Sequence, residues 1–369
     1  MPTPVRWSPP ATRVLVIAAS WTLALVLGYV DQYLHLDDLI RLGKVSSNYA
    51  FLPDLVGTAI MGLVGGLVGG YLLVYKVNSR HRHKSFHADM VRSLVLFLVF
   101  FLGLAVVLFF GMAFVYNATR MDLVSAARAG WTNVLVNLNG PSFFSGMVTW
   151  GLLVLVTQFM LQVNEKFGPG VLWKLITGRY YQPREEKRIF MFLDLKASTA
   201  MAEKLGHRGF FELLREVYQD ITWPVTACGG EIYQYVGDEV VISWPPHRGI
   251  RDGDCIRCFF EVEEALESRR PDYIARFGVA PTFKAGAHVG TATVGEIGVV
   301  KKDIVFSGDV LNTTARIQGE CNRHRVNLIV SSDLLQRMDT VDEWHAVPIG
   351  EIPLRGKTAP LALSVVLPA

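Results

Sequence analysis

The sequence predicts two parts of different fold class. The first is an α-helical membrane domain of four transmembrane helices, and the second is an α/β domain with a ferredoxin-like βαββαβ core. Hydrophobic residues make up 51% of the 369 residues, which is high for a purely soluble protein. This apolar excess is concentrated at the N-terminal end, whereas strand-like and helix-like patterns alternate from residue 188 onward.

The N-terminal part contains four apolar runs, each long enough to cross a hydrocarbon core, which takes roughly 20 helical residues. They cover about 13–33, 53–75, 92–116 and 143–163. No clear small-residue cleavage site follows the first run, so we interpret it as a retained anchor and not as a signal peptide.

The second run is rich in regularly spaced glycines. Gly62, Gly66 and Gly70 recur every fourth residue, and Gly65 and Gly69 repeat the pattern one position away. Small residues at this spacing let helix backbones approach closely. We interpret the stripe as a helix-packing face; a hinge is the alternative.

Basic residues set the predicted orientation. The loop 76–92 carries Lys76, Arg80, Arg82, Lys84 and Arg92 against one acidic residue, and the segment after the fourth run is also basic. The positive-inside rule then places both termini and this loop in the cytoplasm, and the loops 34–52 and 117–142 outside. We expect a multi-pass protein of the inner or plasma membrane whose soluble domain is cytoplasmic.

Two small groups of ligand-type side chains have alternative interpretations. His81, His83 and His87 suit a metal or haem site, but a solvated basic loop near lipid headgroups explains them more simply. Cys255 and Cys258 form a single CxxC, which lacks the second pair that zinc or redox chemistry needs, so we interpret them as ordinary thiols. The net charge of +3 is too small to indicate nucleic-acid binding.

A short segment joins the two parts. The Gly-Pro-Gly at 168–170 should end the last membrane helix, and Pro183 with the charged run after it marks a boundary. We therefore expect a transmembrane domain at 1–163, a coupling segment at 164–187 and a soluble domain at 188–369. We expect regulation to pass through 164–187, but no motif names a stimulus or ligand for the membrane part.

In the soluble domain, strand and helix patterns follow one another in the order strand–helix–hairpin–helix–strand, which is that of a ferredoxin-like core. The predicted elements are a strand at 188–195, a helix at 207–227, a hairpin at 230–244, a helix at 251–269, paired strands at 282–298, a strand at 303–307, a helix at 309–322 and short strands at the C-terminal end.

Two aspartates lie at strand ends of this core. Asp194 ends the first strand, and Asp238 lies at the tip of the hairpin, whose strands neighbour the first strand. Paired carboxylates on rigid strands suit Mg²⁺ or Mn²⁺ shared with substrate phosphates, whereas either aspartate alone is better explained as a turn or cap residue. Glu239, one residue further along a strand, should point to the opposite face and is not counted as a ligand.

Further residues suit an anionic phosphate substrate. The stretch from Lys196 through Ala197 and Ser198 to Thr199 leads into a helix whose free backbone N–H groups suit triphosphate oxygens. Asn312 and Arg316 are four residues apart and so share one helix face, and the arginine suits a phosphoryl transition state. Arg355 adds positive charge near the C-terminal end. A surface ion pair is the simpler alternative for Arg316.

Together these residues resemble a known family. The stretches "FMFLDLKASTAMAEKLG", "YQYVGDEVV", "GDVLNTTARI" and "LRGK" occur in the order and spacing of the catalytic domain of class III nucleotidyl cyclases, the adenylyl and guanylyl cyclases. The resemblance covers about 187–367, close to half of the chain.

The resemblance implies a set of site residues. It implies metal ligands at Asp194, Leu195 and Asp238 for two Mg²⁺ or Mn²⁺ ions per site, a ribose-orienting residue at Asn312, a transition-state arginine at Arg316 and a phosphate contact at Arg355. In this family one domain supplies the aspartates and another supplies the asparagine and arginine. A chain with one such domain is therefore expected to act as a homodimer with two equivalent sites.

The implied reaction converts ATP to 3′,5′-cyclic AMP and pyrophosphate by in-line attack of the ribose 3′-hydroxyl. The purine-binding positions fall on Gln234 and Val305, which depart from the family's usual residues there. Glutamine both donates and accepts hydrogen bonds and suits either purine, whereas valine does neither. We expect ATP, and GTP or dual specificity is the alternative.

Two other functions compete with this one. "VGDEVV" also resembles the hairpin of diguanylate cyclases, but the "DVLNTTARI" helix and the "LRGK" strand have no counterpart there. A catalytically silent signalling module is the other alternative. Such relatives typically lose a metal aspartate or the Asn–Arg pair, and all four of these residues are present here.

Overall fold

The computed structural model describes residues 10–42, 51–77, 86–167, 178–300, 302–338, 343–357 and 359–369. The chain divides into two compact units, Met1–Trp173 and Lys174–Ala369, each with its own internal packing. His81 and His83, and much of the predicted coupling segment, lie outside the described residues, as does the side chain of His87.

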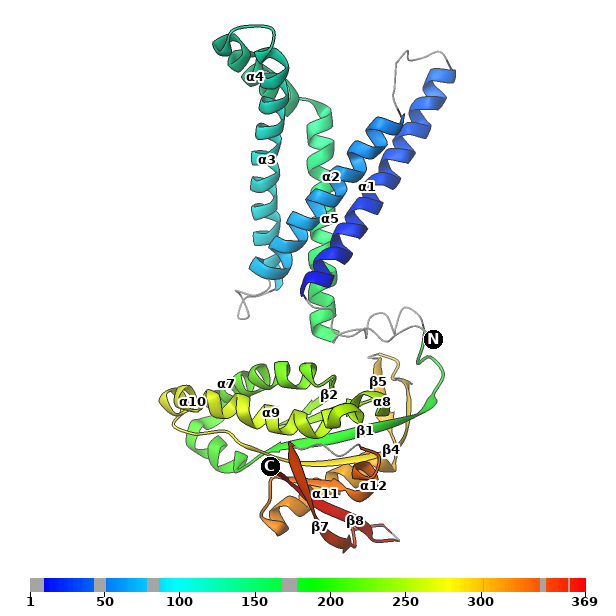
Figure 1. The fold of residues 1–369 in the computed structure, drawn as a ribbon, viewed down its shortest axis with the longest axis vertical. Coiled ribbons are helices and arrows are strands. Elements are labelled where there is room, and N and C mark those ends of the chain that lie inside the picture. Colours follow the sequence, from blue (N-terminus) through cyan, green and yellow to red (C-terminus); the bar gives the residue numbers. More distant parts are fainter. Residues whose placement is uncertain are drawn as a thin grey trace. The chain divides into compact units, whose positions relative to one another are not determined.

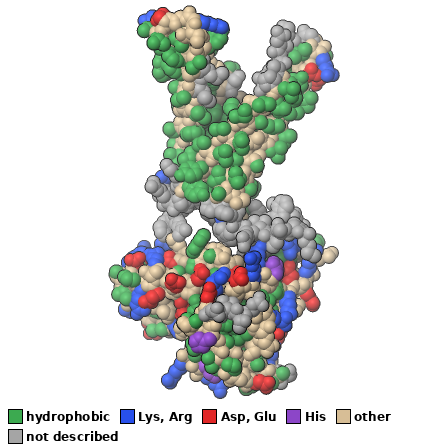
Figure 2. Space-filling model, in the orientation of Figure 1, with side chains coloured by type: hydrophobic (Ala, Val, Ile, Leu, Met, Phe, Trp, Pro, Cys, Tyr) green, Lys and Arg blue, Asp and Glu red, His purple; other side chains and the backbone are tan. Residues whose placement is uncertain are grey.

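The first unit is helical (Figure 1). Its elements are α1 (Pro10–Arg41), α2 (Phe51–Tyr71) with a π-helical continuation (Leu72–Val77), α3 (Phe86–Ala118), α4 (Leu123–Leu138) and α5 (Pro141–Phe167). Among the described residues, four stretches are long and apolar enough to cross a membrane, and they lie at Ala11–Asp38, Leu55–Tyr75, Met90–Ala118 and Phe143–Asn164. The prediction of four such helices is confirmed. Figure 2 shows hydrophobic side chains over much of the visible surface of these helices.

The glycine stripe of α2 is a packing face, as predicted. A Cβ atom on Gly66 would lie 2.5 Å from the Cα of Ala18 on α1, and one on Gly62 would lie 2.7 Å from the Cα of Thr22. The neighbouring stripe meets aromatic rings, since a Cβ on Gly65 would lie 2.4 Å from the ring of Trp150. The backbones of α1 and α2 can therefore approach closely only because these side chains are absent.

The connection 117–142, for which the sequence predicted an outer location and no helix, contains the helix α4 over most of its length. Asp122 caps the helix, its carboxylate accepting a hydrogen bond from the backbone N–H of Ser125 at 3.0 Å. Ala126, Gly130 and Val134 are buried at four-residue spacing, and a Cβ on Gly130 would lie 2.8 Å from the ring of Phe110 on α3. Packing against α3 thus stabilises this short helix.

Gly66→Ala should destabilise the first unit by about 1–3 kcal/mol, because the added methyl group overlaps the backbone of α1. Gly103→Ala in α3 is the matched control, since a Cβ there would meet nothing within 4 Å. The thermal midpoint of the full chain in detergent should fall for Gly66→Ala alone. An equal shift in both variants would contradict the close packing of α1 on α2.

The second unit contains an eight-stranded sheet in its described residues, with the strand order β2-β3-β1-β4-β6-β8-β7 and β5 paired to β4. The strands are β1 (Arg184–Leu195), β2 (Glu231–Val236), β3 (Glu239–Trp244), β4 (Phe283–Ile297), β5 (Asp303–Ser307), β6 (Leu328–Ser331), β7 (Trp344–Ile352) and β8 (Leu361–Pro368). The four strands β4-β1-β3-β2 pair antiparallel throughout. They form the predicted ferredoxin-like core, which is confirmed.

Helices cover both faces of this sheet (Figure 1). The helices are α7 (Ser198–Ala227), α8 (Pro246–Gly249), α9 (Asp254–Ser268), α10 (Arg270–Phe277), α11 (Asp309–His324) and α12 (Ser332–Leu335), with a 3₁₀ turn at Arg251–Gly253. The odd residues of β1, including Met191 and Leu193, pack with α7 and α9 in the larger core. The even residues Phe190 and Phe192 pack on the opposite face with Val310 of α11. Because side chains alternate along a strand, Asp194 lies on the α11 face.

The segment predicted as paired strands at 282–298 is a single long strand, β4, and that prediction is wrong. Two of its glycines, Gly286 and Gly290, allow close contact with α11 and do not form a turn. A Cβ on Gly286 would lie 2.3 Å from the backbone nitrogen of Gln318, and one on Gly290 would lie 2.8 Å from Val310. The strand continues through both glycines while α11 lies directly against it.

Candidate active site at the ends of β1 and β3

Asp194 lies between two other charged residues in neighbouring strands. It is the register partner of Glu239 on β3 and of Lys284 on β4. Directly opposed residues of antiparallel strands point to the same face, so these three side chains lie together on the α11 side of the sheet. The end of β1 thus carries two carboxylates and one ammonium group.

Two side chains bind the carboxylate of Asp194 directly. Lys284 Nζ lies 2.8 Å from Asp194 Oδ2, and Gln318 Nε2 donates to the same oxygen at 3.1 Å. Lys284 Nζ also donates to Asn322 Oδ1 at 3.1 Å, so α11 contacts this group of residues twice. Lys284, Gln318 and Asn322 were not identified in the sequence, because only the strand register and the packing of α11 bring them to Asp194.

Asp238 lies in the turn between β2 and β3, next to the register pair of Asp194 and Glu239. Gly237 supplies the positive φ of 63° that the turn requires. Tyr218 of α7 donates its hydroxyl to the carbonyl oxygen of Gly237 at 2.7 Å, and its ring stacks on Tyr235 with centroids 4.5 Å apart. The contacts of Tyr218 on α7 therefore hold the turn that carries Asp238 in place.

The expectation that Glu239 points away from the site is wrong with respect to Asp194. Glu239 lies opposite Asp194 in the register and on the same face. Its burial, followed by the nearby charges of Asp194 and Asp238, raises its pKa to about 7. The three carboxyl groups are thus close enough to interact. The expectation assumed that side chains alternate from Asp238 to Glu239 along one strand. Asp238 lies in a turn and not in a strand, so this alternation does not apply.

Tyr218→Phe should loosen this turn, since it removes the hydroxyl donor to Gly237 but keeps the stacked ring. Burial and the nearby Asp238 raise the pKa of Tyr218, so the hydroxyl stays protonated at neutral pH. The loss of about 1 kcal/mol should raise amide hydrogen exchange around residues 236–239 roughly fivefold. Tyr181→Phe, at an exposed position, is the control and should leave that exchange unchanged. Unchanged exchange in Tyr218→Phe would show that the hydrogen bond does not hold the turn.

The loop after Asp194 contains the predicted phosphate contacts Lys196 to Thr199, and these residues differ in how they are placed. The backbone N–H of Lys196 donates to the carbonyl oxygen of Thr282 at 2.9 Å, and its ammonium contacts Asn327 Oδ1. Lys196 is therefore engaged within the fold, and its N–H does not face a ligand as expected. Ala197 has the left-handed φ of 54° and directs the chain into α7, which begins at Ser198. The helix N-terminus, which includes Thr199, remains a suitable anion site.

Asn312 and Arg316 lie on α11, where Asn312 is exposed and Arg316 half-buried. A Cβ on Gly356 would lie 3.3 Å from Arg316 Nη2, so Arg316 lies against the turn that carries Arg355. At roughly 100° per residue, Arg316 and Gln318 point about 160° apart around the helix. The side of α11 with Asn312 and Arg316 therefore differs from the side that contacts Asp194 of the same chain.

The two predicted purine-binding residues lie on neighbouring segments. Gln234 is exposed on β2, just after a bulge in its pairing with β3, and Val305 is half-buried on β5. Tyr233 and Phe306 connect these strands, because the backbone N–H of Phe306 donates to the hydroxyl of Tyr233 at 3.1 Å. The structure thus brings β2 and β5 together. The sequence did not indicate that Tyr233 contacts β5.

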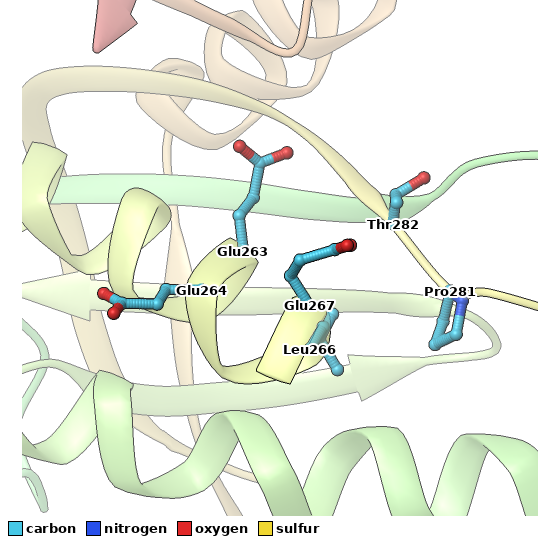
Figure 3. A pocket seen from close by; sticks show the side chains of 6 residues that line it. All are labelled: Glu263, Glu264, Leu266, Glu267, Pro281 and Thr282. Carbon is cyan, nitrogen blue, oxygen red and sulfur yellow. The ribbon is translucent and has the colours of Figure 1, made fainter. Parts of the chain in front are cut away.

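A separate open pocket lies between α9 and the residues before β4 (Figure 3). It is lined by Glu263, Glu264, Leu266, Glu267, Pro281 and Thr282. Its three carboxylates would repel a triphosphate, so it does not suit the predicted substrate.

Cys255 and Cys258 are fully buried on α9, and Cys228 is buried beside them in the same core. Burial raises the pKa of the Cys255 thiol, as is typical of a structural cysteine. In the part of the chain that the structure describes, no group of three or more His, Cys, Asp or Glu side chains is placed to hold a metal ion.

The α/β unit has the fold of class III nucleotidyl cyclase catalytic domains. The chain is similar to the structure of a bacterial light-regulated adenylyl cyclase, with a TM-score of 0.52 and 20% identity over 62% of this chain and 67% of that chain. A second structure of such a protein gives a TM-score of 0.51, also at 20% identity, over 59% and 63%. At this level of identity the similarity shows the fold.

In sequence, the chain is 38% identical over 205 residues to Adenylate cyclase 2 of Rhizobium meliloti (strain 1021), which is 56% of either protein. It is 26% identical over 182 residues to Adenylate cyclase 1 of the same organism, covering 46% of this chain and 26% of that protein. No family model matches the chain. The chain thus spans little more than half of the first relative and about a quarter of the second. These relatives confirm the resemblance that the motifs indicated.

Proposed function

We propose that this protein is a membrane-anchored adenylate cyclase that converts ATP to 3′,5′-cyclic AMP and pyrophosphate as a homodimer. One observation carries the proposal: Asp194 lies opposite Glu239, next to the turn that carries Asp238, while Arg316 lies on a different side of α11 from Gln318, which contacts Asp194. The similarity to two proteins named adenylate cyclase supports the choice of reaction.

The donor set at the sheet edge fits Mg²⁺ or Mn²⁺. Asp194, Asp238 and the backbone oxygen of Leu195 are hard oxygen donors, and substrate phosphates would complete the coordination. Burial and, after it, the negative charges of Asp194 and Asp238 raise the pKa of Glu239. When bound, two such ions would supply the positive charge that acidifies the ribose 3′-hydroxyl and neutralises the departing pyrophosphate.

The chain's own residues orient and neutralise the nucleotide. The N–H groups of Ala197, Ser198 and Thr199 at the start of α7 suit the phosphate oxygens, and Arg355 adds a cation. Asn312 orients the ribose, and Arg316 offsets charge on the α-phosphoryl group as the ring closes. With its N–H and ammonium bound within the fold, Lys196 contributes to the shape of this loop and not to a phosphate contact.

The proposed site is shared between two copies of the chain. Within one chain, Gln318 faces Asp194, so Asn312 and Arg316 are turned toward a different neighbour. A two-fold dimer satisfies this arrangement, because each α11 then serves the metal residues of its partner and both sites are equivalent. A monomer should therefore be inactive.

Base recognition is the least constrained part of the proposal. The exposed amide of Gln234 can pair with either purine, and Val305 contributes only an apolar surface. ATP is the proposed substrate because both relatives are named adenylate cyclases. Assaying the purified protein with ATP and with GTP, in Mg²⁺ and in Mn²⁺, tests this choice. Cyclic GMP as the main product would overturn it, and cyclic di-GMP would indicate the diguanylate alternative.

Mixing two inactive variants tests the shared site. Asp238→Ala and Arg316→Ala should each lose on the order of 10²-fold or more in activity. Co-expression in equal amounts should restore about a quarter of wild-type activity, because half of the dimers are mixed and keep one intact site. Asp194→Ala with Asp238→Ala is the control, since both changes damage the same half-site and every mixed dimer stays inactive. Restoration of activity in both pairs of variants, or in neither, would contradict a site shared between two chains.

We further propose the membrane as the location, with the soluble unit and both termini cytoplasmic, and with domains at 1–163 and 188–369 joined by 164–187. The four apolar helices support this arrangement. If the membrane part regulates the site, a purified 180–369 fragment should differ in specific activity from the full chain in membranes. Equal activity under every condition tested would indicate that the helices are only an anchor.

A further inference from the structure

The proposed reaction does not account for the ion pair between Lys284 and Asp194. The two side chains form an ion pair at 2.8 Å, and their side chains are only 13% and 24% exposed. The ammonium occupies one acceptor site of this oxygen and neutralises part of the negative charge that a metal ion would need. It also opposes a nearby divalent cation by charge repulsion, which is stronger for partly buried groups than in open solvent.

We propose that Lys284 is a built-in competitor for the metal ion at Asp194, and that metal binding displaces its ammonium from the carboxylate. The inference rests on the proposed metal site. The displaced ammonium keeps a partner, because Lys284 Nζ already donates to Asn322 Oδ1 on α11 at 3.1 Å. Lys284 is thus a positioning residue that sets the affinity of the site for the ion and does not itself react.

Gln318 has the opposite effect in this arrangement. Its amide donates to Asp194 Oδ2 at 3.1 Å and carries no charge, so it orients the carboxylate without opposing a cation. Gln318 is itself almost fully buried, and its backbone lies against Gly286 of β4, which fixes its position. The two contacts on one oxygen therefore predict changes of opposite sign: removal of the lysine charge strengthens metal binding, and removal of the amide weakens it.

Lys284 also connects Asp194 with the helix α11, because its ammonium contacts both Asp194 and Asn322. Asn322 and Gln318 lie on α11, the helix that carries Asn312 and Arg316 toward the partner. After displacement from Asp194, the ammonium of Lys284 keeps its hydrogen bond to Asn322 of α11.

The test measures Mn²⁺ binding to the intact protein in neutral detergent without nucleotide, from the loss of the free-ion signal in electron paramagnetic resonance. Lys284→Gln should bind Mn²⁺ roughly three- to tenfold more tightly, because an opposing charge is removed. Lys284→Met is a second variant of similar length, should the first not fold. Gln318→Leu should bind several times more weakly.

Two variants separate the effect of this charge from that of charge in general. Lys284→Arg keeps the charge and should bind Mn²⁺ like the wild type. Lys302→Gln removes a lysine that is paired with Glu296 on an exposed surface, and it should also leave the affinity unchanged. Equal or weaker Mn²⁺ binding by both Lys284→Gln and Lys284→Met would overturn the proposal, because Lys284 would then support the site and not compete for it.

Asp194→Asn and Asp238→Asn distinguish this inference from the proposed function. If Mn²⁺ binding by the wild type does not depend on both aspartates, the proposed metal site is wrong. If binding depends on both and the Lys284 variants leave it unchanged, the metal site stands and the competition by Lys284 is wrong.

Discussion

The alternation of side chains along β1 is the constraint on which the second unit depends. Odd residues such as Met191 pack under α7 and α9, so Asp194 must lie with the even residues on the α11 face. Pairing on both sides then sets Glu239 and Lys284 beside it. A shift of one residue in this register would bury the aspartate among apolar side chains.

The close approach of α11 follows from the same strands. Gly286 and Gly290 leave no Cβ on the face of β4 that α11 covers, so the backbone of α11 lies directly on the sheet. This contact delivers Gln318 to Asp194 and turns Arg316 toward the Gly356 turn. One helix therefore has two functional sides. The proposed dimer with shared sites is based on this difference between the two sides of α11.

The helical unit uses glycine for the same purpose in a different setting. Gly62 and Gly66 allow α2 to lie on the backbone of α1, while Gly65 accommodates the ring of Trp150. In the proposed membrane location, such contacts would take the place of the hydrophobic driving force that holds α7 and α9 on the sheet. Trp21 adds one polar contact, donating from Nε1 to the hydroxyl of Thr157 at 2.8 Å.

The sequence by itself determined the four apolar helices, the ferredoxin-like core and the positions of Asp194 and Asp238 at strand ends. These follow from local periodicity and composition, which each segment carries within itself. Only the tertiary structure decided that Glu239 and Lys284 flank Asp194, that Gln318 binds it, and that Lys196 is engaged within the fold. Such contacts depend on strand register and helix packing between residues far apart in the chain, and a local pattern contains neither.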